Sequence, residues 1–280
     1  MHRVFVSVDF EGLPYIVSRE HLAPRRSLFQ EAREIVTRFV AFTAEKLLEI
    51  GYKEVIVADS HALMINIDPK LLPRGVKLVR GYPRRFSMVA SSKGSRFAVF
   101  LGYHARAGAS SVFSHTYSGS TFYRVSLNGE EASEYLLNAY LLGEWMVPVG
   151  VVAGSVELLD DVRKYTPWAE IVKLKESIGY YSAISASIEE LLEELGKALD
   201  RAHSKSERGE LKPLGIDKPI EVRIEFMNPA YAEAMELVPG VNRVSGREVV
   251  ISVESMEQAY KIVELAALVG SGVRSAVEVR

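Results

Sequence analysis

The 280-residue chain is long enough to bury one large core, or one core with a smaller lobe beside it. Its formal net charge of -2 and its lack of a basic block argue against nucleic acid or an anionic membrane as a partner and favour a small ligand. There is no cysteine, which excludes disulfides and thiolate metal sites, so any metal would be held by His, Asp and Glu. The chain opens without a signal-peptide pattern, and we therefore expect a cytoplasmic protein.

Strand-like and helical patterns alternate through the first two-thirds of the chain. Residues 3–10 predict a strand, and 27–51 predict a long amphipathic helix that ends at its glycine. Two further strands are predicted at 53–60 and 96–103. Their Val, Ile and Phe residues run on without alternation, which is typical of strands covered on both faces in a parallel-rich sheet.

The middle of the chain predicts a hairpin and a buried helix. The Asn-Gly pair at 128–129 follows a β-rich run and indicates a two-residue hairpin turn before a helix at 133–145. The apolar stretch 135–154 approaches membrane-spanning length, but three residues interrupt it: Asn138, Glu144 and Pro148. We therefore predict a buried helix followed by a buried strand at 147–154, and no membrane partner.

A helix at 187–202, opened by a capping box of Ser187 and Glu190, ends the first part of the chain. A polar stretch follows. After it, strands are predicted at 220–226 and 247–253, a turn at 228–229 and an amphipathic helix at 255–270. The GSG at 270–272 is predicted to cap that last helix.

The predicted fold class is α/β, a parallel-rich mixed sheet flanked by helices, with a smaller C-terminal α+β lobe. The domains are predicted as a metal-binding catalytic domain at 1–202, a linker at 203–219 and the smaller lobe at 220–280, which could pack as part of the same unit.

Ionisable side chains gather where the predicted strands end. In an open α/β sheet, ligands bind at the carboxyl ends of the parallel strands. The first strand ends with Asp9 and Glu11, and a period of two places both carboxylates on one side. The other candidates follow later strands or open the helix at 133–145: His61 after Asp59 and Ser60, then His104, His115 and Glu134.

Each of these residues alone has a purely structural explanation, as a helix cap, a loop ion pair or a surface histidine. Their joint placement favours a shared site, because three of the six histidines lie at or just beyond strand ends. The other three, His2, His21 and His203, lack that placement and are predicted to lie on the surface. Three carboxylates and two imidazoles suit a pair of divalent ions such as Zn²⁺, with one carboxylate bridging them.

Two such ions, about 3.5–4 Å apart, polarise a substrate carbonyl and activate a water. A free α-amino group could also ligate one ion, which would give a preference for chain ends. His115, away from the ions, would then act as general base, general acid or oxyanion stabiliser. The motifs of nucleotide-binding proteins and of serine hydrolases, G-x-x-x-x-G-K-[ST], strand-linked G-x-G-x-x-G and G-x-S-x-G, are absent.

These residues stand in segments that resemble the zinc-dependent D-aminopeptidases of the bacterial dipeptide-transport operon type. The segments spread over almost the whole chain: SVDFEG at 7–12, ADSHALMINI at 58–67, FSMV at 86–89, LGYHARAG at 101–108, Ser114-His115, SEYLLNAYLLG at 133–143, VPVGVVAG at 147–154 and IEFMN at 224–228. Two positions depart from the family pattern, because Ser155 stands where the family tends to have an acid and Tyr180 where it has an arginine, while Lys175 is retained.

The resemblance implies two zinc ions per chain, bridged by Asp9, and these ligands: Asp9, Glu11, His61, His104 and Glu134. It also implies that His115 is catalytic, since the matching histidine of the family is described as a nucleophile. We favour acid–base catalysis or oxyanion stabilisation, because an activated water can already attack. It further implies a short peptide or amide substrate and a large ring-shaped homo-oligomer, with a decamer as the expected form.

We therefore predict a di-zinc metallo-aminopeptidase that removes the N-terminal residue from short peptides or amides, with His115 assisting. A preference for a D-residue is implied by the resemblance only. Two alternatives stay open: a related metal-dependent amidase acting on another small amide, and a non-catalytic metal-dependent binding or assembly protein. Which ligand binds which ion is open as well.

Overall fold

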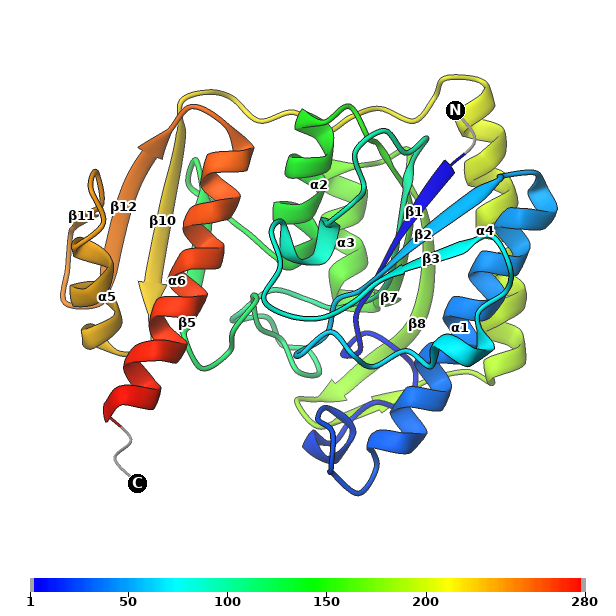
Figure 1. Ribbon diagram of the computed structural model, residues 1–280, viewed down its shortest axis with the longest axis horizontal. Coiled ribbons are helices and arrows are strands. Elements are labelled where there is room, and N and C mark those ends of the chain that lie inside the picture. The colour runs from blue at the N-terminus through cyan, green and yellow to red at the C-terminus, as the bar shows by residue number, and fades with distance from the viewer. Residues whose placement is uncertain (1–2, 278–280) are drawn as a thin grey trace.

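Two sheets, each with its own helices, make up residues 3–277, which are the residues that the computed structural model describes (Figure 1). The first sheet has the strand order β3-β2-β1-β4-β7-β8-β9. Its strands are β1 (Arg3–Val8), β2 (Glu54–Asp59), β3 (Val76–Val79), β4 (Ala98–Tyr103), β7 (Val149–Ser155), β8 (Glu170–Gly179) and β9 (Ser182–Ile184). All neighbours pair in parallel except β9, which is antiparallel to β8. The predicted parallel-rich mixed sheet is confirmed.

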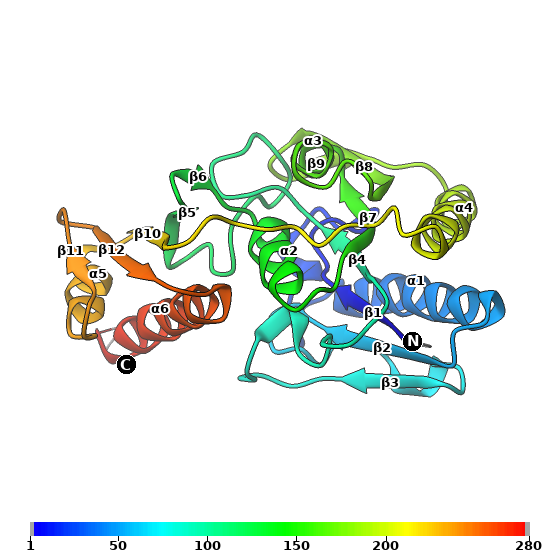
Figure 2. The ribbon, with the colours of Figure 1, turned by 90° about the horizontal axis from the view of Figure 1, so that it is seen from above.

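Helices cover both faces of this sheet, and Figure 2 shows α1 and α4 on one side and α2 on the other. Their bounds are α1 (Phe29–Ile50), α2 (Glu134–Glu144), α3 (Val156–Tyr165) and α4 (Ile188–Glu207). Along β1, Val4 and Val6 pack with α1 and α4, whereas Phe5 packs with α2 and α3. Successive strand residues point to opposite faces, so a continuous apolar run is what a strand covered on both faces requires.

The predicted helix ends are only partly correct. α1 ends at Gly51, whose φ of 115° gives the left-handed cap, and α4 begins with the predicted capping box. However, α4 continues to Glu207, so residues 203–207 of the predicted linker are helical. Ser206 is buried there, and Arg96 donates to its carbonyl oxygen at 2.6 Å, which holds the last turn in place.

The second sheet is antiparallel, with the order β11-β12-β10-β5-β6. Its strands are β5 (Phe122–Leu127), β6 (Glu130–Glu131), β10 (Ile220–Phe226), β11 (Asn242–Arg243) and β12 (Glu248–Val253). The hairpin predicted at 128–129 is confirmed, with φ values of 49° and 83° at its two turn residues. Because β5 and β6 come from the middle of the chain, this sheet draws on 122–131 as well as on the lobe predicted at 220–280.

Two helices, α5 (Pro229–Glu236) and α6 (Met256–Val277), pack against the second sheet. The GSG at 270–272, predicted as a cap, is instead part of α6. Gly270 is buried against Thr121, where a Cβ would lie 2.3 Å from the threonine Cγ2. The glycine therefore serves close packing of the helix, and does not end it.

One apolar core joins the two sheets. Phe100 of the first sheet, Leu136 of α2, and Ile224 and Tyr260 of the second lobe belong to the same buried cluster. In Figure 2, α2 lies between the first sheet and α6, with which it is in contact. This core holds α6 beside the first sheet. No helix within residues 3–277 is long and apolar enough to cross a membrane.

Loops with three short 3-10 helices complete the described chain: η1 (Arg19–His21), η2 (Pro69–Leu71) and η3 (Ser87–Val89). The prediction that His21 lies on the surface is wrong, because His21 is buried and its Nδ1 accepts a hydrogen bond from the Ser18 N–H at 3.1 Å. His203 is half-buried and hydrogen-bonds the Tyr52 hydroxyl at 2.9 Å. His2 lies outside the described residues.

Candidate metal centre

The first two carboxylates of the site follow β1 directly. The Asp9 N–H donates to the Leu101 carbonyl of β4 at 2.8 Å, and the Gly12 N–H donates to the Gly102 carbonyl at 2.7 Å. The loop is therefore pressed against the end of β4. Only a glycine fits at position 12, because a Cβ there would lie 1.8 Å from the Tyr103 carbonyl oxygen.

His61 is held in place by the loop that follows β2. Asp59 accepts hydrogen bonds from the backbone N–H groups of Asn66 and Ile67 at 2.5 and 2.9 Å, and the Asn66 amide donates to the His61 carbonyl at 2.7 Å. The His61 ring stacks on Phe10, with ring centroids 4.5 Å apart. Asp59 thus shapes the loop and does not face the other site residues.

His61 makes the first half of the site with the carboxylates of β1. Its Nδ1 lies 3.0 Å from Glu11 Oε2 and 3.4 Å from Asp9 Oδ1. One ligand atom from each of Asp9, Glu11 and His61 lies within 4.8 Å of the other two, a spacing that a metal ion can span.

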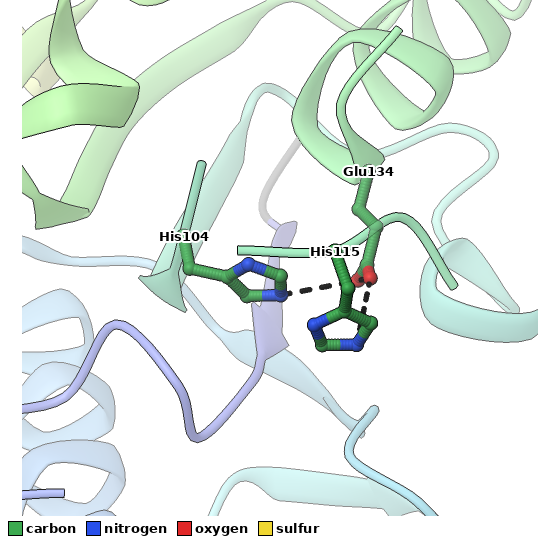
Figure 3. Close-up of side chains that lie close together, drawn as sticks. All are labelled: His104, His115 and Glu134. Carbon is green, nitrogen blue, oxygen red and sulfur yellow. Dashed lines mark ion pairs between the residues drawn. The ribbon is translucent and has the colours of Figure 1, made fainter. Parts of the chain in front are cut away.

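The second half is built from the end of β4, the loop after it and the start of α2. His104 Nε2 lies 3.6 Å from Glu134 Oε1, and His115 Nε2 lies 3.5 Å from the same oxygen (Figure 3). The rings of His104 and His115 stack with centroids 4.4 Å apart. Ser133 caps α2 and the Tyr117 N–H donates to Glu134 Oε1 at 2.7 Å, so the carboxylate is fixed at the helix start.

Asp9 joins the two halves. Its Oδ1 faces His61, and its Oδ2 lies 3.4 Å from His104 Nε2. The two oxygens of one carboxylate therefore face two separate imidazoles, which is the arrangement that a bridging ligand needs. All six residues singled out in the sequence come together here.

The ring orientations of the three histidines favour a cation between them and the carboxylates. In each ring the nitrogen that faces away lies against a backbone carbonyl: His61 Nε2 on Leu22 at 2.8 Å, His104 Nδ1 on Ala105 at 3.0 Å and His115 Nδ1 on Phe113 at 2.8 Å. A carbonyl only accepts, so these nitrogens carry the proton and the inward nitrogens present lone pairs to carboxylate oxygens. Lone pair against lone pair is repulsive, and a metal ion or a proton relieves it.

Burial strengthens this requirement. Asp9, Glu11, His61, His104 and Glu134 are all buried, and the buried Nε2 of His104 has no hydrogen-bond partner. Burial alone would lower the pKa of His61 and of His104, but the carboxylates outweigh it and raise both pKa values well above the usual value. The donor set, oxygen and imidazole nitrogen without sulfur, fits Zn²⁺.

His115 differs from the other five in its exposure. Its side chain is 22% exposed, against 1% for His104. It lines a cavity of about 660 Å³, within the usual range for small-ligand sites, together with Asp9, Glu11, His61 and Glu134. His115 lies close enough to His104 and Glu134 to be a ligand by distance, and exposed enough to reach a substrate.

A buried polar network beneath the site was not predicted. Asn138 of α2 accepts from the hydroxyls of Tyr117 and Tyr260 at 2.9 and 2.7 Å, and donates to the Tyr103 hydroxyl at 3.0 Å. Tyr103 in turn hydrogen-bonds Ser7 of β1 at 2.7 Å. An asparagine within an apolar helix was the available signal, and the other four members of the network lie on four separate segments.

Lys175 is a second buried group near the site. It is 1% exposed and donates to the Ile16 carbonyl at 2.6 Å, which ties β8 to the loop that follows Glu11. Burial lowers the pKa of Lys175 to about 7, although the charges of Glu11, Glu157 and Asp9 act in the opposite direction. The sequence indicated Lys175 only through the family resemblance.

Comparison with known proteins shows the family of this chain. Residues 2–265 match the model of a peptidase family described as D-aminopeptidase. The D-aminopeptidase of Bacillus subtilis (strain 168) is 30% identical over 268 residues, covering 92% of this chain and 94% of that protein. The solved structure of the Zn-dependent D-aminopeptidase DppA from Bacillus subtilis, a self-compartmentalizing protease, has a TM-score of 0.90 at 27% identity and covers 96% of this chain and 98% of that one. The chain therefore belongs to the D-aminopeptidase family.

Proposed function

We propose that this protein is a zinc-dependent aminopeptidase that removes an N-terminal D-residue from short peptides or amides. The observation that carries the proposal is the position of Asp9, whose two oxygens face His61 and His104 separately. The names of its relatives support the zinc and the D-residue, since both relatives are D-aminopeptidases and one is described as Zn-dependent.

The ligands divide into two sets. Glu11, His61 and Asp9 Oδ1 would hold one ion, and His104, Glu134 and Asp9 Oδ2 the other. Bound there, a pair of zinc ions supplies Lewis acidity toward the substrate carbonyl and lowers the pKa of an attacking water. The protein contributes fixed, buried ligands whose outward nitrogens are anchored on backbone carbonyls, so the site needs little rearrangement.

His115 is proposed as the proton carrier. Its Nδ1–H is fixed on the Phe113 carbonyl, which leaves the Nε2 lone pair at the cavity and 3.5 Å from Glu134. Nε2 can therefore take a proton and return it to the leaving amine. The alternative is a covalent intermediate on this nitrogen, and rapid quenching tests it. A covalently modified His115 peptide in the quenched sample would show nucleophilic catalysis instead of acid–base catalysis.

The two departures from the family pattern lie in different surroundings. Ser155 is fully buried at the start of α3. Tyr180 is exposed, but its ring packs edge-on against the ring of Phe113, with centroids 6.0 Å apart, and the Phe113 carbonyl anchors His115. We propose that Tyr180 shapes substrate choice through the loop that carries His115, and that Ser155 does not.

We further propose that the protein forms a closed homo-oligomer, with a decamer as the expected form. The description of DppA as self-compartmentalizing supports this. So does the β8–β9 hairpin, which exposes four large apolar side chains: Ile178, Tyr180, Tyr181 and Ile184. Light scattering on the eluting protein tests it, and a monomeric mass would contradict it. The cytoplasm stays the location predicted from the sequence, in agreement with the lack of cysteine.

The deciding experiment measures hydrolysis of paired D- and L-aminoacyl amides by the zinc-loaded protein. We expect turnover of the D-substrate that a chelator abolishes and zinc restores, with the L-substrate at least tenfold slower. Equal or faster turnover of the L-substrate would remove the D-preference. Hydrolysis of neither, with zinc still bound, would favour the non-catalytic alternative.

A further inference from the structure

One face of α6 lines the same cavity as the residues of the candidate metal centre. Five residues of this helix line it at helical spacing: Glu264, Ala267, Leu268, Ser271 and Arg274. At the rise of an α-helix, the eleven residues from the first to the last of them span about 15 Å. An extended peptide of two or three residues, at about 3.3–3.6 Å each, fits within that length.

Three arginines line this cavity, and two of them are already engaged. Arg84 donates to the carbonyls of Asp59 and Ser87, both at 2.8 Å, and so holds the loop at the cavity edge. Arg85 lies 3.9 Å from the Glu257 carboxylate. Within residues 3–277, Arg274 has no ion-pair or hydrogen-bond partner, and it is half-buried.

Arg274 therefore offers the cavity a guanidinium group that the fold itself does not use. A guanidinium pairs with a carboxylate through two parallel hydrogen bonds, and partial burial strengthens such a pair. Ser271 stands one helical turn earlier on the same face and adds a hydroxyl donor. The lining of the same cavity also includes apolar side chains, among them Leu268, Met64 and Met88.

We propose that Ser271 and Arg274 bind the C-terminal carboxylate of the substrate while its N-terminal residue lies at the metal centre. The inference rests on the proposed function, because it names the substrate class of that same site: short peptides with a free carboxylate. Amides, esters and longer chains that place no carboxylate at α6 are the poorer substrates.

The test compares D-alanyl-glycine with D-alanyl-glycinamide, which differ only in the terminal charge. For the zinc-loaded protein, kcat/KM is at least tenfold higher for the acid than for the amide. Arg274→Gln raises KM for the acid about tenfold or more, leaves kcat close to its original value and leaves the amide unchanged. Arg274→Lys, which keeps the charge but loses the paired donors, restores part of the difference.

Arg247→Gln is the matched control, since Arg247 lies outside the cavity and pairs with Glu225 at 2.9 Å. Its acid-to-amide ratio stays that of the unmodified protein. The proposal is overturned if the unmodified protein treats acid and amide alike, or if Arg274→Gln keeps the ratio.

A binding measurement separates this inference from the proposed function. Calorimetric titration of the metal-free protein with the same acid and amide reports on the carboxylate site without any hydrolysis. Binding of the acid that exceeds binding of the amide, and that Arg274→Gln abolishes, supports the anchor even if no peptide is cleaved. Equal binding of the two compounds by a protein that does cleave them overturns the anchor alone.

Discussion

At the scale of single residues, Gly12 allows the loop after β1 to pack closely against the end of β4, which brings Asp9 near His104. Its N–H donates to the Gly102 carbonyl, and the missing Cβ would collide with the Tyr103 carbonyl at 1.8 Å. Because that contact is with backbone, no side-chain movement relieves it. The close approach places Asp9 within 3.4 Å of His104.

Gly12→Ala is therefore expected to destabilise the fold by about 2–4 kcal/mol, since the loop must move off β4. Urea unfolding of the metal-free protein measures this. Gly215→Ala is the control, because a Cβ at Gly215 meets nothing within 4 Å, and its expected change is below about 0.5 kcal/mol. Equal effects of the two substitutions would show that the contact at Gly12 is not a constraint.

The close approach of Asp9, His61, His104 and Glu134 was predictable because each of the four has a local signal. Asp9, His61 and His104 end or follow apolar strands, and Glu134 opens a capped helix, so strand periodicity and capping place them at one edge of the sheet. Lys175 and His21 had no such signal. Their burial depends on the loop between β1 and α1 folding back over the sheet, which local patterns do not encode.

At the scale of elements, the contact between α2 and α6 is polar at its centre. The Tyr260 hydroxyl of α6 donates to Asn138 of α2 at 2.7 Å and also contacts the Tyr117 hydroxyl. Tyr117 in turn holds Glu134 through its backbone N–H. The hydrogen bonds of a buried network are expensive to leave unmade, so this group ties the second lobe to the metal centre.

Tyr260→Phe removes one hydroxyl from the network and leaves Asn138 short of a donor. The expected loss of stability is about 1–3 kcal/mol, read from chemical denaturation. Tyr231→Phe, on the neighbouring helix α5, changes a buried tyrosine whose hydroxyl has no hydrogen bond within residues 3–277, and should be near neutral. If both substitutions cost the same, the network contributes nothing specific.

Elements with a local pattern were predicted well, and pairings between distant segments were not. Strands β1, β2, β4 and β7 and helices α1, α2 and α4 follow from apolar runs, capping residues and Gly51, whereas β3, β8, β9 and α3 were not predicted. The pairing of β5 with β10 joins residues 122–127 to 220–226, and no sequence pattern in either segment indicates with which strand it pairs. For that reason the second sheet was predicted without its strands from the middle of the chain.

At the scale of the whole molecule, α6 lines the cavity at the candidate metal centre and adds the carboxylate of Glu264 to its wall. Burial raises the pKa of Glu264 to about 7, against the opposing effect of hydrogen bonds from the backbone of Phe86 and Ser87 and of the charges of Lys261 and Arg84. Between the ordinary pKa of 4.5 and about 7, the folded protein holds a proton that the unfolded chain releases. Stability contributed by this group therefore falls as the pH rises through that window.

The expected result is that Glu264→Gln removes this fall. Urea midpoints of the metal-free protein at pH 5 and pH 8 measure it: relative to the variant, the unmodified protein should be less stable at pH 8 than at pH 5. Glu189→Gln, which changes an exposed carboxylate outside the cavity, should keep the original pH dependence. If the unmodified protein were instead more stable at pH 8 than at pH 5 relative to the variant, the fold would stabilise the charged carboxylate of Glu264.

Asp9 is proposed to bridge two metal ions, one in each half of the site. Elemental analysis of zinc per chain after reconstitution and dialysis tests it most directly, on the unmodified protein, Asp9→Asn and Glu11→Gln. We expect two zinc ions in the unmodified protein, loss of both with Asp9→Asn, and loss of one with Glu11→Gln. One zinc ion or fewer in the unmodified protein, or full occupancy in Asp9→Asn, would contradict the bridging role of Asp9.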